Sequence, residues 1–107
     1  MKYYEVSECI DAMSVSISLL CKSNSGKYDI PNVNKKFMDE AYFYNIELSN
    51  LKYEFGFELF KDEIINVYLC VAKKSKEAKY YWNELFDFND PNREQFDLVI
   101  KEFLSKI

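Results

Sequence analysis

Carboxylates interleaved with aromatic rings are the feature of this sequence that could do chemistry. Acidic residues alternate with rings in the segments Glu54-Phe55-Gly56-Phe57-Glu58 and Phe86-Asp87-Phe88. A carboxylate beside an exposed ring can bind Lys and Arg side chains, by ion pairing and by stacking. The alternative is structural, because strand alternation places rings in a core and their acidic neighbours in solvent.

The charges along the chain fall into blocks. Residues 39–63 carry seven acids and two lysines, and residues 84–97 carry five acids and one arginine. Residues 73–79, between them, carry four lysines and one glutamate. A surface built from the acidic blocks would attract a basic partner. The carboxylates predicted to bind it are Glu54, Glu58, Asp62, Glu63, Asp87 and Asp90.

The sequence contains few of the residues and motifs that catalysis and cofactor binding commonly use. The chain has no histidine, so it lacks the commonest general base near neutral pH and the commonest transition-metal ligand. Its two glycines make no phosphate-binding loop. Asp87-Phe88-Asn89-Asp90 begins like a calcium loop, but the turn glycine is missing and the twelfth position is Leu98 instead of Glu. We therefore expect neither an enzyme nor a bound cofactor or metal.

Length, charge and cysteine content narrow the class of protein. The 107 residues predict a single domain, 1–107. A net charge of -4 disfavours nucleic acid and anionic membrane surfaces as partners. Cys9, Cys21 and Cys70 match neither a disulfide framework nor a zinc motif, which suits a reducing compartment, and we expect the protein to be cytoplasmic with buried thiols.

Hydrophobic periodicity changes from helical to alternating in the middle of the chain. Apolar residues recur at helical spacing over residues 5–21, a loop is predicted over 22–34, and Asn34 could cap a short helix with Phe37, Met38 and Ala41 inward. In residues 51–59 every odd position is apolar and every even position is charged or glycine, which predicts a half-buried strand. With flanking strands and a turn at 61–63, a three-stranded antiparallel meander follows over 41–72.

The same middle segment also admits helices. Phe37, Ala41, Tyr44, Leu48, Leu51, Phe55 and Leu59 recur at spacings of three and four, which would suit an all-α protein. That alternative leaves Tyr42, Phe43, Tyr53 and Phe57 off the stripe. The meander is therefore favoured.

Two helices are predicted after the meander. Ala78, Tyr81, Trp82, Leu85 and Phe86 mark the first, over 74–87. Asp90-Pro91 marks the start of the second, whose apolar stripe includes Phe96, Ile100 and Phe103. The predicted class is α+β, with an N-terminal helix, a central antiparallel β-meander and two C-terminal helices; the alternative is an all-α helical bundle.

Small size, acidity and missing catalytic groups together favour binding over catalysis. In these three respects the chain resembles the general type of bacterial toxin-immunity proteins and phage-encoded inhibitors. The expected function is that of a small acidic inhibitor of the immunity or antitoxin type, which neutralises a basic partner, such as a toxin nuclease, by occluding its active site. One alternative is a non-catalytic structural or regulatory subunit of a larger complex. Another is a small enzyme that uses carboxylates or tyrosine.

Overall fold

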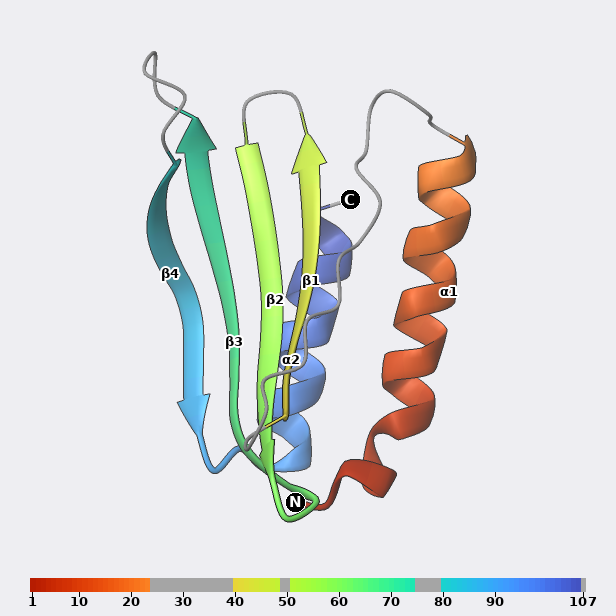
Figure 1. Cartoon of the computed structure of the whole chain (residues 1–107), viewed down its shortest axis with the longest axis vertical. Helices are drawn as coiled ribbons and strands as arrows, with labels where there is room; N and C mark the ends of the chain where they lie inside the picture. Colours follow the sequence, from red (N-terminus) through yellow and green to blue (C-terminus); the bar gives the residue numbers. More distant parts are fainter. Residues whose placement is uncertain (24–39, 49–50, 75–79, 107) are drawn as a thin grey trace.

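The chain folds as one antiparallel sheet flanked by two helices. The computed structural model describes residues 1–23, 40–48, 51–74 and 80–106. Within them the elements are the 3₁₀ turn η1 (Tyr3–Glu5), α1 (Ser7–Ser23), β1 (Glu40–Leu48), β2 (Leu51–Phe60), β3 (Glu63–Lys74), β4 (Tyr80–Asn89) and α2 (Arg93–Ser105). The strands lie in the order β1-β2-β3-β4, each antiparallel to its neighbours (Figure 1).

This architecture confirms the α+β class and excludes the all-α alternative. The N-terminal helix and the three-stranded meander are where the periodicity predicts them. The helix predicted over 74–87 is wrong, because residues 80–89 form β4, so α2 is the one helix that follows the sheet in the described part of the chain. The short helix predicted from Asn34, and nearly all of the loop predicted before it, lie outside the described residues. Ala41, assigned to that helix, lies in β1.

A β-bulge explains why β4 was mistaken for a helix. Glu84 pairs with Cys70 and Phe86 pairs with Leu69, so Leu85 has no partner on β3. An extra residue in one strand shifts its alternation by one position. The apolar residues of β4 therefore lose the period of two, and their spacing imitates that of a helix.

Both helices pack against the same face of the sheet. Figure 1 shows α2 behind the strands, and α1 contributes to the same hydrophobic core. The buried side chains of this core come from the N-terminal segment (Val6, just before α1, and Ile10, Met13 and Ile17 of α1), from the sheet (Tyr44, Ile46, Phe55, Phe57, Leu59, Ile64, Val67, Leu69) and from α2 (Phe96, Val99, Ile100, Phe103). The predicted stripe of the last helix is thus confirmed as core.

Aromatic rings join α2 to β2 at the centre of that core. The Phe55 ring lies 5.7 Å from the Phe103 ring in a stacked arrangement and 6.0 Å from the Phe96 ring, edge to face. Phe57 also contacts Phe96, at 5.9 Å between ring centres. Such pairs stabilise beyond the area they bury, by about 0.5–1.5 kcal/mol each.

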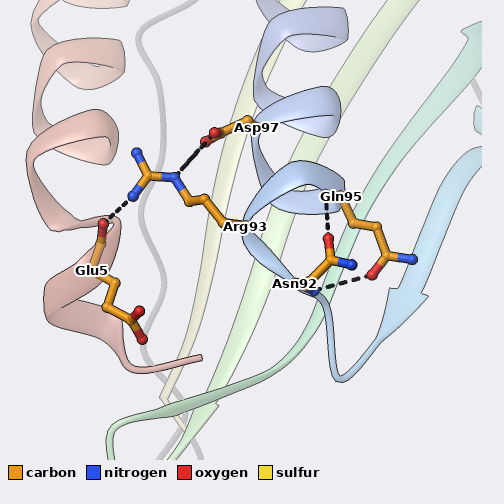
Figure 2. Close-up of polar contacts among 5 residues, drawn as sticks. All are labelled: Glu5, Asn92, Arg93, Gln95 and Asp97. Carbon is orange, nitrogen blue, oxygen red and sulfur yellow. Dashed lines mark hydrogen bonds and ion pairs between the residues drawn. The ribbon is translucent and has the colours of Figure 1, made fainter.

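The start of α2 is held by side chains of its first turn. Asn92 Oδ1 accepts a hydrogen bond from the backbone N–H of Gln95, and Gln95 Oε1 accepts one from the backbone N–H of Asn92. The two bonds make a reciprocal capping box (Figure 2). The cap is therefore Asn92 and not Asp90, the residue that the sequence suggested. Arg93 pairs with Asp97 at 2.9 Å and donates to the Glu5 carbonyl, so its guanidinium ties α2 to the chain entering α1 (Figure 2).

The first residues of the chain pair with the β2–β3 turn. The Tyr3 amide donates to the Asp62 carbonyl at 2.8 Å, and the Ile64 amide donates to the Met1 carbonyl at 2.9 Å. The Glu63 carboxylate accepts from the Met1 amino group at 2.9 Å and from Lys2 Nζ at 3.0 Å. These hydrogen bonds and ion pairs lower the pKa of Glu63 below its ordinary value of 4.5.

Replacing Phe103 by alanine should leave a cavity at the centre of the aromatic core. We expect Phe103→Ala to lower the free energy of unfolding by roughly 3–5 kcal/mol, as for other fully buried phenylalanines. Leu98→Ala is the control, since Leu98 lies on the same helix but is 40% exposed, and should cost less than about 1 kcal/mol. Urea denaturation measures both. Equal effects of the two substitutions would show that α2 does not pack as described.

Glu63 should make folding stability depend on pH in the acid range. Its pKa is lower in the folded chain than in the unfolded chain, so its contribution is present above about pH 4.5 and is lost as the pH falls through the lower folded value. The urea midpoint of the native chain should therefore fall more steeply below pH 4.5 than that of Glu63→Gln. Glu102→Gln serves as the control and should keep the native slope. Parallel curves for the native chain and Glu63→Gln would contradict the ion pairs.

Candidate functional site

Neither α1 nor α2 covers the second face of the sheet, which we call the open face. Because side chains alternate between the two faces, the residues between the core positions all point to this side. It consists of Ala41, Phe43 and Asn45 from β1, Lys52, Glu54, Gly56 and Glu58 from β2, Asn66, Tyr68, Cys70 and Ala72 from β3, and Trp82, Glu84, Asp87 and Asn89 from β4. Figure 1 is seen from this side, with α2 behind the strands.

Among the described side chains, four carboxylates lie on the open face. Glu54 and Glu58 are half-buried on β2, while Glu84 and Asp87 are exposed on β4. The alternation of 51–59 correctly placed the first two away from the core. Glu84 was not predicted, since the helix assigned to its segment concealed that it belongs to a strand. The register is the signal that finds it, because Glu54, Cys70 and Glu84 lie in one row across the sheet.

A tyrosine at the centre of the open face holds Glu54 in place. The Tyr68 hydroxyl donates a hydrogen bond to Glu54 Oε2 at 2.8 Å. Its ring lies across Gly56, where an added Cβ would come within 2.3 Å of the ring, so only glycine leaves room for it. Burial, the hydrogen bond to Glu54 and the charge of that carboxylate raise the pKa of Tyr68, which keeps the hydroxyl protonated as a donor.

An asparagine fixes Asp87 in a similar way. Asn66 Nδ2 donates to Asp87 Oδ1 at 2.5 Å and lies 3.2 Å from both the Phe88 carbonyl and Asn89 Oδ1. Two of the four carboxylates are therefore oriented by neutral donors on β3. A neutral donor leaves the negative charge uncompensated, so the charge stays available to a partner.

The cysteine between these acids is a poor nucleophile. Burial, together with the charges of Glu54, Glu84 and Asp87, raises the pKa of Cys70 to about 11. A thiol with that pKa is almost wholly protonated at neutral pH. Cys9 and Cys70 are both half-buried free thiols, which corrects the expectation that they are fully buried. The side chain of Cys21 lies outside the described residues.

The other three predicted carboxylates lie elsewhere. Asp62 is exposed at the β2–β3 turn, where it lines a hollow of about 370 Å³ with Lys2, Tyr3 and Tyr4. Glu63 is engaged in its two ion pairs. Asp90 follows β4 with a positive φ of 47°, and its amide donates to the Ile65 carbonyl. The structure thus brings together Glu54, Glu58 and Asp87, and not Asp62, Glu63 and Asp90.

The chemical groups on the open face include carboxylates, aromatic rings and amides. In the part of the chain that the structure describes, no three His, Cys, Asp or Glu side chains gather closely enough to hold a metal ion. Neither described helix has the length and apolar composition needed to cross a lipid bilayer. What the face offers is fixed negative charge beside aromatic surface, which suits binding of cationic side chains.

Three comparisons with known proteins were without a match. Neither a protein-family model, nor a curated protein, nor a solved structure gives a significant match to this chain.

Proposed function

We propose that this protein is a small acidic protein-binding inhibitor, of the immunity or antitoxin type, that neutralises a basic partner such as a toxin nuclease by occluding its active site. The observation that carries the proposal is the grouping of four carboxylates on the open face. Among the described side chains of that face, Lys52 is the one base. A nuclease binds phosphates with Lys and Arg, so its active site is a basic surface of the complementary sign.

The spacing of the carboxylates suits several cations at once. Glu54 and Glu84 share a row two strands apart, a separation of roughly 10 Å at ordinary strand spacing. Glu54 and Glu58 are four residues apart on one strand, roughly 13 Å along it. Neither separation allows two carboxylates to share one proton, as the carboxyl pair of an aspartic protease does. Both match the distances between cationic side chains on a protein surface.

The support given to these side chains by the fold favours binding without rearrangement. Glu54 and Asp87 already accept hydrogen bonds from Tyr68 and Asn66, so their rotamers are restricted before a partner arrives. A preorganised surface loses less conformational entropy on association. Half-buried carboxylates such as Glu54 and Glu58 are also less screened by salt than fully exposed ones.

Reversing the charges at Glu54 and Glu58 should slow association with the basic partner. We expect Glu54→Lys with Glu58→Lys to lower the association rate constant roughly tenfold or more at low salt, and to weaken inhibition of the partner's activity to match. The rate is measured by surface plasmon resonance against the basic protein recovered by affinity capture. Added salt should reduce the difference between the native chain and this variant.

The matched control reverses two charges on the opposite side of the molecule. Glu94 and Glu102 lie on α2, behind the sheet, so Glu94→Lys with Glu102→Lys changes the net charge equally without touching the open face. This control should change the rate constant by less than about threefold. Equal effects of the two pairs would mean that only net charge matters. Binding indifferent to both pairs and to salt would contradict the proposal and favour a structural subunit with an uncharged interface.

A further inference from the structure

β4 is the last described strand of the sheet, and one of its two edges has no described strand beside it. It pairs with β3 on one side only, and no other strand of the described chain pairs with its second side. Every second residue of an edge strand directs its N–H and C=O groups outward, where they can pair with another chain. Edge strands limit such pairing with lysine or another charged residue, with proline or with a β-bulge. Residues 80–89 contain no lysine or proline, and their protective features are Glu84, Asp87 and the bulge at Leu85.

The two edges of the sheet differ in their surroundings. Beside β1, Tyr3 of η1 stacks on Tyr42, and Tyr44 and Ile46 are buried in the core that α1 shares. In β4, all residues from 81 to 85 are exposed, and the exposed fractions are 61% for Tyr81, 44% for Trp82 and 42% for Leu85. Large apolar side chains exposed on a strand at the edge of a sheet are typical of a protein–protein contact. The free edge of β4 is therefore the better candidate for strand addition.

Charge decides what can pair there. Glu84 and Asp87 are the charged residues of β4, and both lie on the open face. A second copy of this chain would bring two more acids to the same edge, and like charges on neighbouring strands are destabilising. A strand with Lys or Arg on the open-face side would instead pair with these carboxylates. The opposite side of that strand would lie beside Tyr81, which favours apolar residues.

We infer that β4 binds an extended basic segment of the partner protein by strand addition, and that this segment alternates Lys or Arg with apolar residues. The alternation follows from the sheet, because successive residues of the added strand face the acidic open face and the helix-covered face in turn. The inference rests on the proposed function, in that the partner is basic. It adds main-chain hydrogen bonds along β4 as a second mode of binding. Docking of side chains on the open face would not require these hydrogen bonds.

Peptide probes can test this mode with the intact chain. The first probe is a ten-residue peptide in which Lys alternates with Val, and its control groups the same residues as five Lys followed by five Val. The chain's single tryptophan is Trp82, so its fluorescence reports on β4 directly. The alternating probe should shift the Trp82 emission to shorter wavelength and slow amide hydrogen exchange in residues 81–89 roughly tenfold at saturation. The grouped probe should bind roughly tenfold more weakly.

N-methylation separates pairing through the main chain from docking through side chains. Two further probes carry N-methyl groups on the Lys residues or on the Val residues, which blocks hydrogen bonding along one edge of the peptide at a time. Strand addition predicts that one of them fails to bind while the other binds like the parent. Glu84→Gln with Asp87→Asn should weaken the parent probe, whereas Glu94→Gln with Glu102→Gln should not.

Several results would overturn the inference and leave the proposed function to its own test. These are equal binding of both N-methylated probes, absence of binding by the alternating probe, or slowed exchange of β4 that grows with protein concentration alone. The last would identify a second copy of this chain as the occupant. The proposed function fails separately, if charge reversal at Glu54 and Glu58 leaves binding of the natural partner unchanged.

Discussion

The packing of Phe55 on β2 against Phe103 (stacked) and Phe96 (edge to face) of α2 decides which face of the sheet is buried. These three rings are fully buried at the centre of the core. Since successive residues of a strand face opposite sides, a buried Phe55 and Phe57 direct Glu54, Gly56 and Glu58 to the other side. The same contact that stabilises the domain therefore also builds the acidic surface, and a shift of one residue in β2 would bury its charges.

The open face is left uncovered by α1 and α2 because both helices pack on the other side of the sheet. Its own packing is local: Tyr68 covers Gly56 and donates to Glu54, and Asn66 donates to Asp87. These contacts restrict the carboxylates without neutralising them.

Sequence periodicity predicted the parts of the fold in which it is unbroken. The strict alternation of 51–59 gave β2 and the faces of Glu54 and Glu58, and the stripe through Phe96, Ile100 and Phe103 gave α2. β4 escaped prediction because the bulge at Leu85 breaks its alternation, and a bulge depends on pairing with β3 that no local pattern records.

The candidate site was predictable to the same extent and for the same reason. Half of the six carboxylates predicted from the sequence lie on the open face. Glu84, the fourth carboxylate of that face, was not predicted, because the same bulge disguises its strand. The ion pairs of Glu63 could not be predicted for a different reason: its partners, the Met1 amino group and Lys2, are more than sixty residues away in the chain. Contacts between such distant residues are set by the fold and leave no trace in local spacing.

Carboxylate footprinting of the complex is the most direct test of whether the open face binds the basic partner. The chain, alone and bound to its basic partner, is labelled at accessible carboxylates with a carbodiimide and an amine, and the labelled sites are mapped by mass spectrometry. If the open face binds the partner, Glu54, Glu58, Glu84 and Asp87 lose labelling in the complex, while Glu94 and Glu102 on α2 keep it. Protection of the α2 carboxylates with unchanged labelling of the open face would contradict it.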